Sequence, residues 1–77
     1  EPIMAVNVET LEKLERRMAQ LGEEKARVEA RLADPATYRS TDPAVVQQGS
    51  ARQAELARLL AEAEEQWLAL QEALEKP

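Results

Sequence analysis

The sequence predicts an all-α fold, an antiparallel two-helix coiled-coil hairpin with a compact, partly helical tip that contains proline. Apolar residues recur in strict steps of three and four on both sides of a central break, which is the pattern of a coiled-coil seam. The break, residues 34–43, holds two Asp-Pro pairs, and proline interrupts a helix. A chain of 77 residues is long enough for one such unit, so residues 1–77 are expected to form a single domain.

The first helix is expected over residues 8–33, after a lead-in of residues 1–7. Asn7 is the expected N-cap, because its side chain can accept hydrogen bonds from free backbone N–H groups. Pro35 disfavours the α conformation at Asp34, so the helix should end there. Its seam positions are Leu11, Leu14, Met18, Leu21, Lys25, Val28 and Leu32.

The tip is expected over residues 34–42 and the second helix over residues 43–75. Asp42 and Pro43 form a helix start, an acceptor at the N-cap followed by a ring already suited to the first helical position. Asp34 and Pro35 can start a single turn through Tyr38 in the same way. The seam positions of the second helix are Gly49, Gln53, Leu56, Leu60, Ala63, Trp67, Leu70 and Leu74.

An antiparallel seam pairs residues whose numbers add up to a constant, which allows the register to be predicted. The preferred register pairs Leu11 with Leu70, Leu14 with Trp67, Met18 with Ala63, Leu21 with Leu60, Lys25 with Leu56, Val28 with Gln53 and Leu32 with Gly49. A slip of one heptad is the alternative. The base of the hairpin, residues 11–21 and 56–74, is expected to be well packed and to carry most of the stability, whereas Lys25, Gln53 and Gly49 interrupt the seam toward the tip. Four residues in and beside the tip are expected to form a small cap that closes this end: Tyr38, Leu32, Val45 and Val46.

Composition excludes several kinds of chemistry. The chain has no Cys and no His, which removes thiols, disulfides, imidazole bases and the usual zinc ligands. No signal peptide is expected from residues 1–4, and the sequence has no apolar run near the roughly 20 residues that span a bilayer. We therefore expect a cytoplasmic protein without a membrane partner. The start at Glu1 and the end at Pro77 suggest a fragment of a longer protein.

Charge is divided along the predicted hairpin. From Lys25 to Leu60 there are six basic and four acidic residues, a net charge of +2, whereas the remainder has four basic and eleven acidic residues, a net charge of −7. Arginine side chains suit phosphate, whose oxygens accept paired N–H bonds. The candidate nucleic-acid-binding residues are Lys25, Arg27, Arg31, Arg39, Arg52 and Arg58. Arg31 and Arg52 occupy heptad position g and should lie on one edge, although ordinary solvating charges would give the same pattern.

Other residues that could carry chemistry have simpler interpretations. The acidic runs 23–24 and 62–65 are expected to be solvated, because adjacent helical residues point about 100° apart and do not converge on a metal. Trp67 and Tyr38 could stack on bases. Trp67 falls at a seam position and is expected in the core, whereas Tyr38 is left open between a cap and a contact.

A resemblance to a known family rests on the tip and on a late tryptophan. The stretch 32–38, LADPATY, then Thr41-Asp42-Pro43 and the closing stretch 64–70, EEQWLAL, resemble the C-terminal coiled-coil domain of ABC-F ATPases of the Uup type. The resemblance implies a cytoplasmic parent with two ATP-binding cassettes, using ATP and Mg²⁺, whose hairpin binds DNA or acts on ribosomal RNA. No Gly-rich phosphate loop is present in this chain, so no cofactor and no catalysis are expected here.

Two further interpretations stay open. The hairpin could dock on the cassettes of its own ATPase or on a copy of itself, through glutamates at the e positions Glu15, Glu29 and Glu64. It could also be a tRNA-facing arm of a synthetase, which is ranked lower because of the late tryptophan and the paired Asp-Pro signals. An independent enzyme is ranked last, since nothing groups the carboxylates, hydroxyls and amines into a site.

Overall fold

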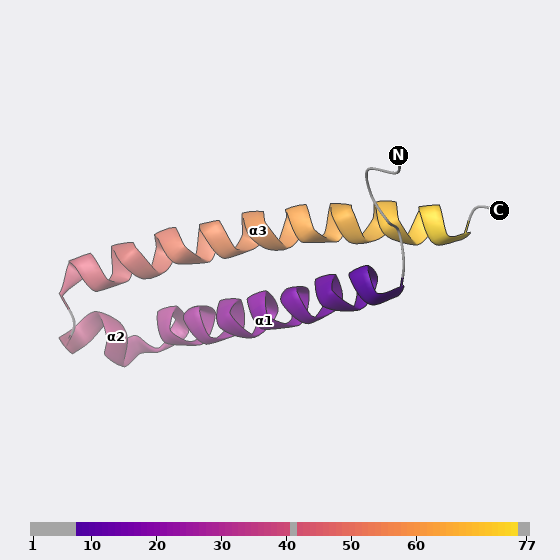
Figure 1. The fold of residues 1–77 in the computed structure, drawn as a ribbon. Coiled ribbons are helices and arrows are strands. Elements are labelled where there is room, and N and C mark those ends of the chain that lie inside the picture. The colour runs from indigo at the N-terminus through magenta and orange to yellow at the C-terminus, as the bar shows by residue number, and fades with distance from the viewer. Residues whose placement is uncertain (1–7, 41, 76–77) are drawn as a thin grey trace.

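Two long helices run antiparallel, side by side, and a short helix joins them at one end (Figure 1). The computed structural model describes residues 8–40 and 42–75, with α1 at Val8–Ala33, α2 at Pro35–Ser40 and α3 at Pro43–Glu75. The molecule is an elongated rod of 57 × 18 × 15 Å. These bounds confirm the predicted all-α hairpin, and the partly helical tip is α2. The predicted N-cap Asn7 lies outside the described residues.

Both Asp-Pro pairs start a helix, as the sequence predicts. The Asp34 carboxylate accepts a 3.0 Å hydrogen bond from the Ala36 N–H, and its carbonyl accepts from Thr37 N–H. The Asp42 carboxylate accepts a 2.9 Å hydrogen bond from the Ala44 N–H at the start of α3. Each aspartate thus caps free N–H groups of the helix that follows it.

The tip folds back onto the end of α1 through hydrogen bonds to its last carbonyl groups. The Thr37 hydroxyl donates to the Arg31 carbonyl at 2.7 Å, and Asp34 N–H donates to the same oxygen at 3.2 Å. The Tyr38 hydroxyl donates to the Leu32 carbonyl. Because these carbonyls have no partner within α1, α2 satisfies groups that the helix end leaves free.

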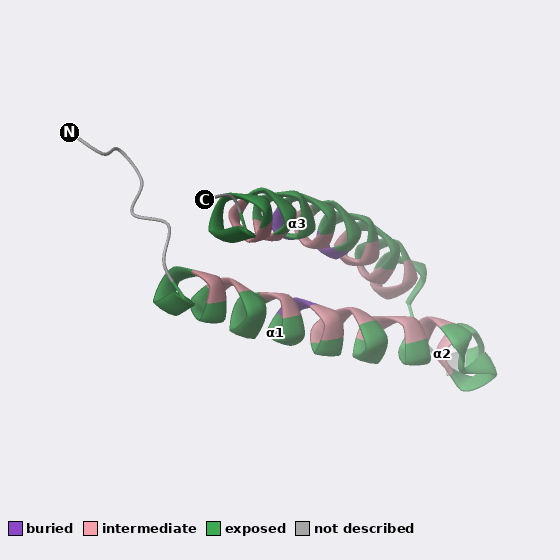
Figure 2. Cartoon of the chain, turned by 90° about the vertical axis from the view of Figure 1, so that its right-hand side faces the viewer, coloured by how far each residue is buried: buried purple, intermediate pink, exposed green. Residues whose placement is uncertain are grey.

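The core is a narrow strip between α1 and α3 (Figure 2). Leu56 is fully buried, and Leu21 and Ala63 are nearly so. The other predicted seam residues are partly buried, except Leu74, which is 40% exposed. Fully burying a leucine contributes roughly 1.5–3 kcal/mol, so the stability of the hairpin is concentrated near its middle.

The preferred register is confirmed at the tip. A Cβ placed on Gly49 would lie 3.2 Å from Leu32 Cδ2, so these two residues face each other as predicted. A slip of one heptad would separate them by about two helical turns, and it is therefore wrong.

The three buried residues all lie in the region predicted to be well packed, but both ends of the hairpin are more open than predicted. At the base, an apolar groove of about 590 Å³ opens beside Leu14 and Leu70, because Ala69 and Ala73 are too small to fill it. At the tip, the predicted cap is open, since Tyr38 is 54% exposed.

No helix among residues 8–40 and 42–75 is long and apolar enough to cross a membrane.

Candidate functional site

The six candidate basic residues divide into two groups of three. Lys25 Nζ lies 2.7 Å from Glu29 Oε2, and Arg58 Nη1 lies 2.8 Å from Glu62 Oε2. The Arg52 guanidinium binds two carboxylates, Glu24 at 2.7 Å and Glu55 at 2.6 Å. Lys25, Arg52 and Arg58 are therefore already compensated within the hairpin. Such surface pairs contribute little to stability, because solvent and salt screen the attraction between exposed charges.

Arg27, Arg31 and Arg39 have no ion pair with any described residue, and all three are exposed. Arg27 and Arg31 are four residues apart on α1, so their side chains lie one turn apart on the same face. Arg39 stands on α2 just beyond them. An exposed arginine without a carboxylate partner keeps its donors available for an anion.

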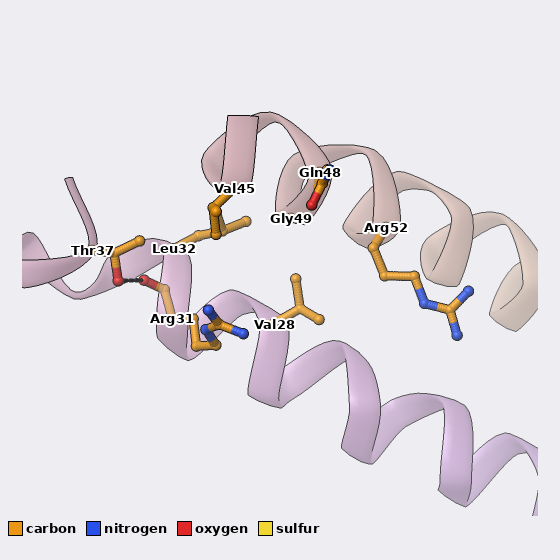
Figure 3. A pocket seen from close by; sticks show the side chains of 8 residues that line it. All are labelled: Val28, Arg31, Leu32, Thr37, Val45, Gln48, Gly49 and Arg52. Atoms are coloured by element: carbon orange, nitrogen blue, oxygen red, sulfur yellow. Dashed lines mark hydrogen bonds between the residues drawn. The ribbon is translucent and has the colours of Figure 1, made fainter. Parts of the chain in front are cut away.

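Arg31 and Arg52 line one hollow between the helices, as expected from their shared heptad position (Figure 3). The hollow has a volume of about 210 Å³ and a mainly apolar wall that includes Val28, Leu32 and Val45. It stays open because Gly49 carries no side chain on the α3 side. The two guanidinium groups thus stand on opposite helices along the same side of the hairpin.

Two further cations belong to this side and were not among the candidates. Lys13 and Arg17 line the base groove together with Gln66 and Ala73 of α3. Lys13 precedes Arg31 by about five full turns of 3.6 residues, so both project from the same face of α1. Neither has an ion pair with a described residue. We call this side the cationic edge: Lys13, Arg17, Arg27, Arg31 and Arg52. The signal in the sequence is the four-residue step repeated in both halves of α1.

The opposite side is acidic. Trp67 Nε1–H donates to Glu15 Oε2 at 2.9 Å, and Gln53 Nε2–H donates to Glu29 Oε2 at 3.0 Å, so both carboxylates bridge across to α3. Trp67 is partly buried in the seam, as predicted. We call this side the acidic edge, which comprises heptad positions b and e: Glu12, Glu15, Glu29, Glu64 and Glu75. No Lys or Arg occupies these positions in the sequence of either helix.

Two ionisable groups respond to these contacts. Hydrogen bonds from Lys25 and Gln53 hold the pKa of Glu29 below its ordinary value, because they favour the ionised carboxylate. Hydrogen bonds to Glu24 and Glu55 raise the pKa of Arg52 above its ordinary value. Both residues therefore stay charged across the physiological pH range.

The acidic runs do not assemble a metal site in the part of the chain that the structure describes, where no three acidic side chains come together. Two of their members neutralise basic residues instead, since Glu24 pairs with Arg52 and Glu62 with Arg58.

Comparison with known proteins agrees with the hairpin and its two Asp-Pro signals. A family model described as the ABC transporter C-terminal domain matches residues 8–72. No curated protein and no solved structure matches the chain significantly. The match covers α1, the tip and most of α3, so the family rests on the whole hairpin. The chain belongs to the ABC transporter C-terminal domain family, which confirms the predicted resemblance to the C-terminal domain of an ABC-F type ATPase and makes it a helical accessory domain, not a catalytic cassette.

Proposed function

We propose that this domain binds DNA through the phosphate backbone, without reading base sequence, for a cytoplasmic ABC-F ATPase. The observation that supports the proposal is the set of exposed arginines in the tip and the adjoining end of α1, Arg27, Arg31 and Arg39, that pair with no described carboxylate. Guanidinium groups bind phosphate through paired N–H bonds, and such contacts carry no base information.

The charge distribution along the hairpin is consistent with DNA binding at the tip end. The half that contains the tip has a net charge of +2 and the remainder −7, so a polyanion is attracted to the tip and repelled by the base. The hairpin then projects its tip, 57 Å at most from the base, toward the nucleic acid. In this proposal the parent supplies two cassettes that bind ATP and Mg²⁺, and the domain itself needs no cofactor.

The test is DNA binding by the 77-residue chain across a salt series, with Arg27, Arg31 and Arg39 all changed to Gln. We expect the affinity to fall at least tenfold at low salt and the dependence of log K on log salt to become shallower by about 2–3, since each lost phosphate contact contributes roughly 0.9.

The matched control adds three negative charges elsewhere, through Ala19→Glu, Ala26→Glu and Ala61→Glu on exposed positions of the acidic edge. Control and variant have the same net charge. Equal loss of affinity in both would show that only net charge matters, and the tip assignment would be abandoned.

A second candidate function is docking on a cassette of the parent or on another copy of the hairpin. The observation that favours it is the acidic edge, whose charge complements the cationic edge of a second hairpin. Sedimentation distinguishes the two functions, because docking between copies produces a concentration-dependent dimer that weakens with salt even when no DNA is present.

A further inference from the structure

The tip carries an aromatic ring that is both fixed and accessible. The Tyr38 hydroxyl donates to the Leu32 carbonyl, which anchors the far end of the side chain, while its backbone belongs to α2. The residue is nevertheless 54% exposed. An anchored ring loses little conformational entropy when a ligand covers it, so the position favours binding over simple packing.

This ring forms one wall of an open hollow of about 330 Å³. The other walls are Pro43, Val46 and Gln47 at the start of α3. The lining thus combines an aromatic face, an apolar ring and methyl groups with one amide that can both donate and accept hydrogen bonds. A nucleobase has the matching properties, with flat faces that stack and a polar edge.

The basic residue that follows Tyr38 in the chain favours a ligand that carries phosphate. Arg39 follows Tyr38 directly in the chain and has no ion pair with a described residue. The nearby carboxylate of Asp42 is engaged with the Ala44 N–H as a helix cap. A base on Tyr38 would therefore have a cation within reach of its phosphate.

We propose that Tyr38, Pro43, Val46 and Gln47 bind one unpaired nucleobase of DNA by stacking on the tyrosine ring, with Arg39 at the adjacent phosphate. The tip then prefers single-stranded or gapped DNA to continuous duplex, because bases inside a duplex have no free face. This inference rests on the proposed DNA binding and adds the structural state of the DNA that is bound.

The experiment compares the binding of a thymine oligonucleotide and of a blunt duplex by the 77-residue chain and by two variants. Tyr38→Leu keeps an apolar side chain but removes the aromatic face, and we expect it to weaken single-strand binding about tenfold while duplex binding stays within twofold. Tyr38→Phe keeps the ring but removes the hydroxyl anchor, so we expect single-strand binding weaker than that of the unmodified chain and stronger than that of Tyr38→Leu.

Photo-crosslinking gives an independent readout on the unmodified chain. A strand containing 5-iodouracil should crosslink to Tyr38, and peptide mass spectrometry would identify the residue. Crosslinks that avoid Tyr38, or equal losses on single strand and duplex in Tyr38→Leu, would overturn the stacking site. If the unmodified chain binds neither DNA at low salt, the proposed function itself fails, which is a distinguishable result.

Discussion

The two long edges of the hairpin are built from the same two helices yet differ in charge. The cationic edge carries three arginines and a lysine on α1 and one arginine on α3, whereas heptad positions b and e of the acidic edge hold no basic residue. The carboxylates of Glu24 and Glu55, which lie on the cationic edge, form ion pairs with Arg52. The net charge of −5 therefore does not describe what a partner meets, since it averages two surfaces of opposite character.

The charge is not divided simply between the two halves of the hairpin. Counting charges by halves separates a basic tip from an acidic base, but Lys13 and Arg17 extend the cationic edge into the acidic half. A partner that follows this edge meets cations along most of α1. A partner that touches only the tip meets Arg27, Arg31 and Arg39.

The largest expected effect comes from breaking the seam that holds both edges in place. Leu56 is fully buried, so Leu56→Ala should lower the free energy of unfolding by about 2–5 kcal/mol. In so small a domain this removes much of the total stability. Urea unfolding followed by far-UV circular dichroism measures it.

The control for that variant is Leu68→Ala on the outer side of α3. Leu68 is 57% exposed, and the change should cost about 0.5 kcal/mol or less. Similar losses from the two substitutions would contradict a core concentrated at the middle of the hairpin.

The next largest effect shows whether DNA contacts the whole cationic edge or only the tip. A charge swap changes Lys13 and Arg17 to Glu and, on the acidic edge, Glu12 and Glu64 to Lys, which leaves the net charge unchanged. If DNA follows the whole cationic edge, the affinity should fall about tenfold or more and the salt dependence should become shallower by about 2.

Fluorescence anisotropy with labelled duplex across a salt series measures this swap. Arg16→Glu combined with Glu23→Lys is a matched control at exposed positions of α1 that belong to neither edge. Unchanged binding by the four-residue swap would confine the contact to the tip.

A smaller effect on stability is expected from replacing the two glycines, one beside each edge, with alanine. Nothing lies within 4 Å of a Cβ on Gly22, so Gly22→Ala should stabilise α1 by about 0.5–1 kcal/mol through helix propensity. A Cβ on Gly49 would meet Leu32 Cδ2 at 3.2 Å, so Gly49→Ala should gain less. Thermal unfolding of both variants tests the order, and a larger gain at Gly49 would mean that Leu32 yields without cost into the hollow.

The smallest effect is a dependence of stability on acid pH at the acidic edge. Lys25 and Gln53 lower the pKa of Glu29 in the folded chain, so its contribution is present above the ordinary glutamate pKa and is lost as the pH falls through the lowered value. Glu29→Gln should flatten this acid-side loss. Urea midpoints between neutral and acid pH measure it, with Glu12→Gln, at an exposed position of the same edge, as the control.

The helices and their ends could be predicted because their signals are local. The Asp34 and Asp42 caps and the two prolines act within a few residues, so both helix bounds agree with the structure. The register was predictable up to one alternative, a slip of one heptad, which the contact between Gly49 and Leu32 excluded. The family followed from the same tip residues and from Trp67.

The candidate site was only partly predictable. The sequence identified six cations, but nothing in it indicated that Glu24, 28 residues from Arg52, would bind that guanidinium. Nor did it indicate that the Tyr38 hydroxyl would reach the Leu32 carbonyl and leave the ring half exposed. The open groove beside Ala69 and Ala73 likewise depends on the spacing between the helices.

The sequence by itself therefore determined the hairpin, its Asp-Pro caps and its family, because apolar periodicity and Asp-Pro pairs act through near neighbours. Only the tertiary structure decided which arginines are compensated, which cations share an edge and which part of the seam is closed. These properties depend on distances between side chains of α1 and α3, and those distances are set only when the two helices pack.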